Sequence, residues 1–311
     1  MKDSMNTKNF PKVSILMNCY NGERYLHECI ESVFHQSFDD WEIVFIDNCS
    51  TDNSGEIARS YEPKLKYFKT NYNISLGEAR AFGIDKCNGE YLMYLDVDDR
   101  YHKNTINILL NEIIGTNNLV VYAGHRNINH SGDVIGKYKP KPKSGKIFSD
   151  LLSQFDIPTA SLIMNLSKYK EFGYKYDKEV KVSSEYNLFM KLSVLNNFKC
   201  IRGEIVDYRI HADATTFQNQ EYASRDRIFT LEKIISEHPD IVLKFPLQFK
   251  EAFARADYYK ARTHIEKNEL VLARKIMRKH IFLSLKYMFV YSILFFPETI
   301  RKYIFTKKYN I

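Results

Sequence analysis

The segment that decides the fold is Gly89-Glu90-Tyr91-Leu92-Met93-Tyr94-Leu95-Asp96-Val97-Asp98-Asp99. Its first half, after the turn residues Asn88-Gly89, is an apolar run with the length of a buried strand. Three carboxylates then follow within four positions. Like charges this close repel one another and raise each other's pKa, unless a cation or several hydrogen-bond donors compensate them. The segment therefore predicts a buried strand that ends in a site for a hard divalent cation such as Mn2+ or Mg2+.

The three carboxylates need not act alike. Side chains alternate along an extended segment, so Asp96 and Asp98 are expected on one side and Asp99 on the other. A second interpretation is that Asp98 and Asp99 cap a helix that begins near His102. The sequence leaves open whether Asp99 binds metal or caps this helix.

Length, cysteine content and the first residues limit the class of protein. A chain of 311 residues is long enough for one large folded unit with an appendage. Its five cysteines are scattered and form no Cys-x-x-Cys pair, which indicates reduced, intracellular thiols. Residues 1–10 are polar and lack the apolar core of a signal peptide. We therefore expect a cytoplasmic protein.

Strand-like and helix-like segments alternate along the first hundred residues. Strands are expected at 13–19, 41–46, 65–68 and 91–95, and helices at 23–36, from about 50 to 61, and at 79–87. Ser50, Thr51 or Asp52 is the expected cap of the second helix. This order is typical of an α/β fold with a mostly parallel sheet and helices on both faces. A further strand is expected at 119–123, followed by a loop or hairpin at 125–144.

In such a sheet, ligands bind where the strands end at their carboxyl edge. The polar loops at 18–22, 47–52 and 96–99 should therefore meet there. No Gly-x-Gly-x-x-Gly follows the first strand, and no Gly-Lys-Ser/Thr loop is present, which disfavours a dinucleotide oxidoreductase and a phosphate-loop nucleotidase.

Several motifs follow one another in the order and spacing seen in one enzyme family. They are Cys19-Tyr20-Asn21-Gly22, Ile46-Asp47 with Ser50-Thr51-Asp52-Asn53-Ser54, Asn73 with Gly77 and Arg80, Gly89-Glu90-Tyr91 with Asp96-Val97-Asp98-Asp99, Ile157-Pro158-Thr159-Ala160-Ser161, the stretch from Ser184-Glu185 to Leu192, and Tyr208-Arg209-Ile210-His211. In these residues, from roughly Pro11 to Thr216, the chain resembles family 2 glycosyltransferases. The resemblance implies the GT-A nucleotide-diphospho-sugar transferase fold. It also implies an N-terminal tail (1–10), a catalytic domain (11–216) and a helical C-terminal region (217–311).

The resemblance implies how four residues hold a nucleotide-sugar donor. Tyr20 would stack on the base, and Asp47 would accept its imide N–H, as a uracil or thymine ring allows. Arg80 would lie near the base and phosphates, and Asp96 near the ribose. The simpler alternatives are that Tyr20 packs on its own helix and that Arg80 is an exposed helical arginine.

The resemblance also implies the residues of the reaction centre. Asp98 would ligate the divalent metal, His211 would lie at the same metal–pyrophosphate site, and Glu185 would be the base that deprotonates the acceptor hydroxyl. The alternative for Glu185 is a carboxylate favoured by the dipole at a helix N-terminus.

The chain departs from the family pattern at three places. Ser184 replaces the first acid of a Glu-Asp pair and leaves Glu185 alone. Asn18-Cys19 replaces a usual Pro-Thr, and Asn48-Cys49 a common Asp-Gly, both near the expected base-binding residues.

The net charge of +7 is concentrated near the C-terminus, where nine lysines and arginines after residue 268 face only Glu269 and Glu298. The adjoining segment 281–296 is almost wholly apolar, but it is shorter than the ~20 residues that a membrane span requires. A helix lying in the interface of an anionic membrane fits this composition. A helix packed in the protein core is the alternative.

These residues together predict an inverting, metal-dependent glycosyltransferase. It would move a sugar from a nucleoside-diphosphate donor, a UDP-sugar, to a hydroxyl of a glycan or lipid-linked acceptor in cell-surface polysaccharide synthesis. The alternative is a nucleotide-sugar-binding protein without turnover. Nucleic acid is not an expected partner, since its binding would need basic residues interleaved with aromatics on a folded face, and the basic cluster here is instead attached to an apolar helix.

Overall fold

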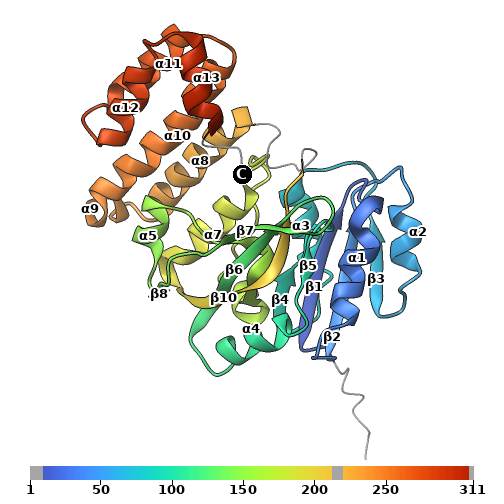
Figure 1. Ribbon diagram of the computed structural model, residues 1–311. Helices are drawn as coiled ribbons and strands as arrows, with labels where there is room; N and C mark the ends of the chain where they lie inside the picture. The colour runs from blue at the N-terminus through green and yellow to red at the C-terminus, as the bar shows by residue number, and fades with distance from the viewer. Residues whose placement is uncertain (1–9, 212–219, 308–311) are drawn as a thin grey trace, which may run out of the picture. The chain divides into compact units, whose positions relative to one another are not determined.

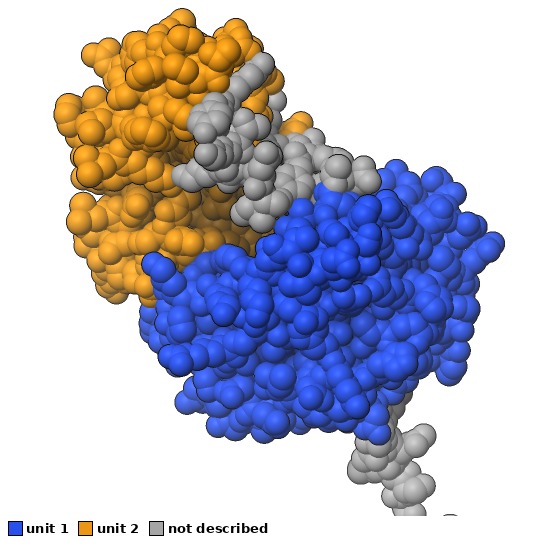
Figure 2. All heavy atoms as spheres, in the orientation of Figure 1, with its two compact units in different colours: residues 1–147, 156–176, 195–211 blue, residues 148–155, 177–194, 212–311 orange. Residues whose placement is uncertain are grey.

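The computed structural model describes residues 10–211 and 220–307. It divides into two compact units, coloured separately in Figure 2. The first comprises residues 1–147, 156–176 and 195–211, and the second comprises 148–155, 177–194 and 212–311. The boundary expected at 216–217 lies outside the described residues. The second unit also includes two earlier segments, and the later of these carries Glu185.

The first unit is built on a ten-stranded sheet with the strand order β3-β2-β1-β4-β9-β6-β10-β5 (Figure 1). β7 pairs with β6, and β8 pairs with β10. The strands are β1 Val13–Cys19, β2 Trp41–Asp47, β3 Leu65–Lys69, β4 Tyr91–Tyr94, β5 Arg100–Tyr101, β6 Asn118–Ile128, β7 Val134–Tyr138, β8 Ser144–Gly145, β9 Leu162–Asn165 and β10 Asn197–Arg209. The four strands predicted in the first hundred residues are confirmed, and β6 and β7 form the expected hairpin.

The parallel half of the sheet explains why the site lies where it does. β1 is parallel to β2 on one side and to β4 on the other, and β2 is parallel to β3. Helices connect these strands, so all four carboxyl ends reach the same edge of the sheet. Apolar runs form β1, β2 and β4 because these strands are buried on both faces. β9 then runs antiparallel to β4 and β6, so the complete sheet is mixed.

The helices of the first unit differ from expectation mainly at their ends. They are α1 Glu23–Phe34, α2 Ser54–Arg59, α3 Leu76–Ile84, α4 Thr105–Ile113 and α6 Leu166–Phe172. The expected cap of α2 at Ser50, Thr51 or Asp52 is wrong, because Asn53 is the N-cap and makes no side-chain cap bond. Asp52 instead accepts hydrogen bonds from the backbone N–H groups of Glu23 and Ser54, and so ties the start of α1 to the start of α2.

The second unit is helical, as predicted for the C-terminal region. Its helices are α5 Phe148–Ser153, α7 Ser184–Leu195, α8 Gln220–Glu237, α9 Ile241–Lys244, α10 Pro246–Glu266, α11 Leu270–Met277, α12 Leu285–Ile293 and α13 Glu298–Lys307. α10 packs against α8, α11 and α5 (Figure 1). Of the helices described, none has both the length and the apolar character that a membrane crossing requires.

Candidate functional site

The loops after β1 and β2 are locked together at the carboxyl edge of the sheet. Cys19 and Asp47 are paired at the ends of these strands, and the Asn48 N–H donates to the Cys19 carbonyl at 2.7 Å. The Asn21 side chain accepts from the Thr51 N–H at 2.8 Å. These bonds fix the loop that carries Tyr20, whose side chain is 56% exposed. Tyr20 is therefore available for stacking with a ligand, whereas the alternative of a ring packed on its own helix does not fit this exposure.

Asp47 lies beneath these loops and is only 1% exposed. Its Oδ1 accepts from the Ser50 N–H at 2.7 Å, and its Oδ2 accepts from the Tyr67 hydroxyl at 2.5 Å. Burial and the bond to this carboxylate raise the pKa of Tyr67 to about 12. Asp47 thus holds the loop after β2 in shape.

The acidic segment after β4 is a turn, so the expected alternation along an extended segment is wrong. Val97 and Asp98 occupy the turn, and the Asp99 N–H donates to the Asp96 carbonyl at 3.0 Å. The turn still separates the three acids, since the side chains of Asp96 and Asp98 are 41% and 28% exposed and Asp99 is 1% exposed. The helix-cap interpretation is wrong as well, because α4 begins at Thr105 with Asn104 as its N-cap.

Asp99 is turned into the protein. Its Oδ1 accepts from the backbone N–H of Arg209 at 2.8 Å, and its Oδ2 has no hydrogen-bond partner among the described residues. Burial, followed by repulsion from Asp98 and Asp96, raises the pKa of Asp99 well above its ordinary value. This environment favours a structural role for Asp99, as the anchor between the acidic turn and β10.

Arg80 of α3 contacts the acidic turn through Asp96. Its Nη2 donates to Asp96 Oδ1 at 3.0 Å, and its guanidinium lies 5.3 Å from the centre of the Tyr94 ring. Burial alone would lower the pKa of Arg80, but the Asp96 carboxylate outweighs it and the pKa is raised. With only 2% of its side chain exposed, Arg80 is not the exposed helical arginine of the alternative interpretation. It fixes the orientation of Asp96.

Asp98 and His211 meet at the ends of β4 and β10, with 2.9 Å between Asp98 Oδ2 and His211 Nε2. Burial and repulsion from Asp96 raise the pKa of Asp98, against the opposing effect of the His211 hydrogen bond. The pair offers a carboxylate oxygen and an imidazole nitrogen, and the excess negative charge around it would favour a cation. The described residues contain no cluster of three or more candidate ligand side chains. The donor set therefore fits an Mn2+ or Mg2+ ion that takes its remaining ligands from water or substrate oxygens.

Arg209 also belongs to this site, although the motif Tyr208-Arg209-Ile210-His211 predicted no role for it. It is 2% exposed, and its Nε donates to the Asp98 carbonyl at 2.8 Å. Its Nη2 donates to Glu28 at 2.6 Å, and the guanidinium stacks 4.3 Å from the centre of the Tyr25 ring. Together with the bond from its own N–H to Asp99, these contacts hold the backbone of the acidic turn against β10.

The alternation of side chains along β10 could have indicated this role from the sequence. Side chains two residues apart share a face of an extended segment. The expected position of His211, just after β10, therefore implies that Arg209 and Asp207 lie on the same side as His211. Asp207 is 2% exposed and accepts from Arg100, Arg126 and His102 at 2.6, 2.7 and 2.8 Å. These three bonds outweigh the effect of burial and lower the pKa of Asp207 strongly.

We expect Arg209→Lys to destabilise the protein by roughly 2–4 kcal/mol, since an ammonium cannot replace the guanidinium fork in a buried position. The acidic turn should also loosen, so the stabilisation by Mn2+ with donor should fall. Urea unfolding and thermal melting measure the two effects. Arg24→Lys is the control, because Arg24 is exposed and lies over the same Tyr25 ring. Equal stabilities of Arg209→Lys and the parent protein would contradict this role.

Glu185 belongs to the second unit, in the first turn of α7. The Ser184 hydroxyl donates to Glu185 Oε1 at 3.0 Å. Asp226 of α8 fixes the chain just before this point, because its Oδ2 accepts from the N–H groups of Lys181, Val182 and Ser183 at 3.0, 2.7 and 3.0 Å. Asp226 is 1% exposed and acts as an anionic cap for the start of α7. Nothing local in the sequence pointed to it.

We expect Asp226→Ala to lower the free energy of unfolding by about 2–4 kcal/mol, because three backbone N–H groups lose a buried, charged acceptor. Asp226→Asn should cost less, since its amide oxygen can still accept. Chemical denaturation tests this order, with Asp240→Ala as the control at an exposed residue that makes no side-chain cap bond. If Asp226→Ala and Asp240→Ala were equally stable, the cap would be unimportant.

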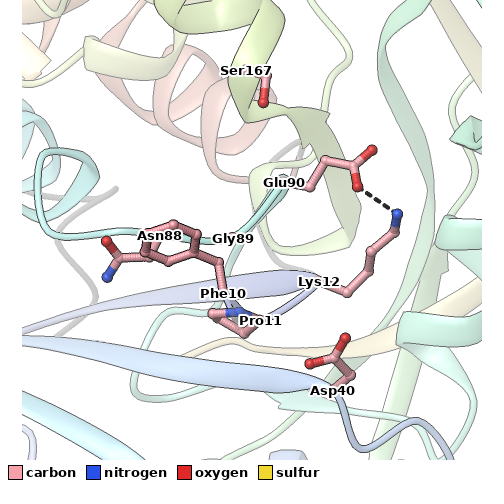
Figure 3. Close-up of a pocket in the computed structure, with 8 residues that line it drawn as sticks. All are labelled: Phe10, Pro11, Lys12, Asp40, Asn88, Gly89, Glu90 and Ser167. Atoms are coloured by element: carbon pink, nitrogen blue, oxygen red, sulfur yellow. Dashed lines mark hydrogen bonds and ion pairs between the residues drawn. The ribbon is translucent and has the colours of Figure 1, made fainter. Parts of the chain in front are cut away.

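A hollow of about 310 Å3 lies elsewhere on the first unit (Figure 3). Lys12 and Glu90, which line it, precede β1 and β4 and form an ion pair at 2.5 Å. The hollow is therefore at the amino ends of these parallel strands, opposite the edge that carries Tyr20 and Asp98. It has no part in the candidate site.

Comparison with known proteins agrees with this architecture. The model of the family described as "Glycosyl transferase family 2" matches residues 14–172, half of the chain. A protein of Rickettsia typhi described as an uncharacterised glycosyltransferase is 27% identical over 273 residues, which cover 85% of this chain and 84% of that protein. Chondroitin synthase of Escherichia coli is 24% identical over 240 residues, which cover 75% of this chain and 34% of the synthase.

Two solved structures share the fold. S. aureus TarS (residues 1–349), in complex with UDP-GlcNAc, has a TM-score of 0.61 at 16% identity, and the match covers 96% of this chain and 93% of that one. The mannosyltransferase PcManGT of Pyrobaculum calidifontis, in complex with GDP-Man and Mn2+, has a TM-score of 0.61 at 11% identity, with coverage of 97% and 85%. The expected α/β fold of the GT-A type with C-terminal helices is thereby confirmed.

Proposed function

This chain belongs to glycosyl transferase family 2, and from that premise we propose that it transfers a sugar from a UDP-sugar to a hydroxyl of a glycan or lipid-linked acceptor in cell-surface polysaccharide synthesis. The observation that carries the proposal is the approach of Asp98 to His211 at 2.9 Å, at the sheet edge where the exposed Tyr20 and the Arg80–Asp96 pair also lie. A site for a nucleoside-diphosphate sugar needs an aromatic group for the base, a polar group for the ribose and a cation-binding group for the diphosphate, and these residues provide all three.

The donor would lie across the ends of β1, β2 and β4. Tyr20 would stack on the base, while Asp47 would accept its imide N–H after exchanging a present partner. Asp96, oriented by Arg80, would accept a ribose hydroxyl. The two solved structures of similar fold are complexes with UDP-GlcNAc and GDP-Man, which supports a nucleoside-diphosphate sugar as the class of donor.

Asp98 and His211 would hold Mn2+ or Mg2+, as the presence of Mn2+ in the PcManGT complex supports. When bound, the ion would neutralise charge that develops on the departing nucleoside diphosphate. Neighbouring residues hold Asp98 and His211 in position. Arg209 holds the backbone of the turn that presents Asp98, and Tyr25 lies against His211 with 5.6 Å between ring centres.

Glu185 would be the catalytic base, by the family resemblance and by its fixed place at the start of α7. Its carboxylate would take the proton of the acceptor hydroxyl while the hydroxyl oxygen bonds to the anomeric carbon. The bond from that carbon to the diphosphate breaks in the same step, which inverts the configuration. General base catalysis of this kind contributes roughly 100- to 10,000-fold.

A donor screen by thermal shift, with Mn2+ present and absent, tests this function. A ligand that binds only the folded state raises the apparent stability with its occupancy. We expect a UDP-sugar to raise the melting temperature more than GDP-, CMP- or dTDP-sugars do, and to need Mn2+ for the full effect. Incubation of that donor with acceptor glycans should then release UDP. Binding without release of UDP would favour the alternative, a nucleotide-sugar-binding protein without turnover. Absence of any shift would contradict both.

A further inference from the structure

α12, with the turns on either side of it, has one apolar face that is packed and another that is not. Tyr287, Val290 and Leu294 point inward and join a core with Ala273 and Met277 of α11. Among the outward side chains are Phe282, Leu285, Met288, Phe289 and Phe296, which are 97%, 78%, 48%, 58% and 49% exposed. We call these five residues the aromatic face. The inner core settles the packing of this segment within its own unit, and it leaves the aromatic face uncovered.

Three members of the aromatic face share one side of α12. Leu285, Met288 and Phe289 lie within this helix at spacings of three and four residues, while Phe282 and Phe296 lie in the turns before and after it. Scattered exposed apolar residues are normal on a protein surface, but a group of five within one short segment is typical of a site of contact with another molecule.

Within the segment that carries the aromatic face, all charged residues before Glu298 are basic. From Leu270 to Pro297 the chain contains no Asp or Glu and five lysines or arginines. Four of these bases are exposed, namely Lys275, Arg278, Lys279 and Lys286. A partner that covers the aromatic face must therefore be apolar and must carry or tolerate negative charge beside the apolar contact.

We propose that the aromatic face and these four bases form a binding surface for an anionic phospholipid bilayer. Phenylalanine and leucine side chains would enter the boundary between headgroups and acyl chains, and the bases would contact the lipid phosphates. A second copy of the chain fits less well, because it would bring two sets of like charges together. α12 has only nine residues, so it would lie in the interface without crossing the bilayer. This inference goes beyond sugar transfer and does not depend on it.

Vesicle flotation of the full chain tests the proposal. We expect the protein to float with vesicles of phosphatidylcholine and phosphatidylglycerol at 7:3, and not with phosphatidylcholine alone. Each base near an anionic surface strengthens binding roughly fivefold, so Lys279→Glu with Lys286→Glu should lower the partition coefficient more than tenfold. Phe282→Asp with Phe289→Asp should lower it at least as much. High salt should weaken the binding of the parent protein.

The matched control is Leu243→Asp with Leu247→Asp, since these leucines of the same unit are 79% and 67% exposed but lie outside the aromatic face. This variant should float like the parent protein, and equal melting temperatures would show that all variants are folded. A spectroscopic test uses Phe289→Trp. The native Trp41 is 6% exposed, so a blue shift of emission with anionic vesicles would report insertion of the new side chain.

Two outcomes would overturn the proposal. One is that the parent protein fails to float with anionic vesicles while Phe289→Trp shows no blue shift. The other is that light scattering finds a dimer which Phe282→Asp with Phe289→Asp converts to a monomer, with equal flotation of both; a second copy would then cover the aromatic face. Neither outcome would bear on the donor screen, because that assay uses soluble ligands.

Discussion

Asp98→Asn is expected to lower the rate of sugar transfer by about a thousandfold or more. The substitution keeps the size of the side chain and removes the charge that would hold the cation beside His211. A cation that stabilises the leaving diphosphate lowers the activation barrier by several kcal/mol. Asp98 is the one carboxylate proposed to bind this cation, so its loss should remove most of that stabilisation and slow the reaction accordingly. Steady-state rates with saturating donor and excess Mn2+ measure the effect.

Asp98→Asn should lower the transfer rate without lowering the stability of the protein. A stability measurement therefore distinguishes the loss of a metal-binding side chain from damage to the fold. Burial and the repulsion from Asp96 raise the pKa of Asp98, so the native state disfavours its charged form in the absence of metal. A group with a raised carboxyl pKa contributes unfavourably to stability once the pH exceeds its unfolded value. The neutral Asp98→Asn variant should therefore unfold at the same or a higher temperature than the metal-free parent protein at pH 7.

Binding experiments complete the test of Asp98. Isothermal titration should show that Mn2+ strengthens donor binding to the parent protein but not to Asp98→Asn. Asp85→Asn, at an exposed position after α3, is the control and should behave like the parent protein. Retention of Mn2+-dependent donor binding by Asp98→Asn would mean that the cation is held elsewhere.

The sequence predicted the parallel core well because its signals are local. β1, β2 and β4 are short apolar runs that end in polar residues, and this pattern requires no knowledge of the rest of the chain. The same runs indicated which loops meet at the carboxyl edge. The geometry inside those loops was harder to predict. Alternation suggested an extended acidic segment, whereas a hydrogen bond from Asp99 to Asp96 closes it into a turn.

The residues that support the site could not be found from local patterns. Arg209 donates to the Asp98 carbonyl across 111 positions of sequence, and Asp226 accepts from Val182 across 44. Both are buried charged residues, which a structure tolerates when every partner is in place. A sequence shows the charge but not the partner, so the supporting residues appear only when strands and helices from distant parts of the chain are brought together.

Glu185→Gln is expected to lower kcat by roughly 100- to 10,000-fold with little change in donor affinity. Glutamine can keep the hydrogen bond from the Ser184 hydroxyl, so the start of α7 should hold its shape while the proton acceptor is lost. An unchanged thermal shift with donor and Mn2+, together with a lost rate, would assign Glu185 to the chemical step.

Glu185→Asp and Ser184→Ala distinguish a base from a carboxylate that only favours the helix. Aspartate keeps the charge at the start of α7 but shortens the side chain, so a base should lose rate while the stabilisation by the helix dipole is retained. Ser184→Ala removes a hydrogen bond to Glu185 and should have a smaller effect on kcat. If Glu185→Gln kept the parent kcat and lost only unfolding free energy, Glu185 would be a helix-terminal carboxylate, and the base would have to be sought among other acids of the chain.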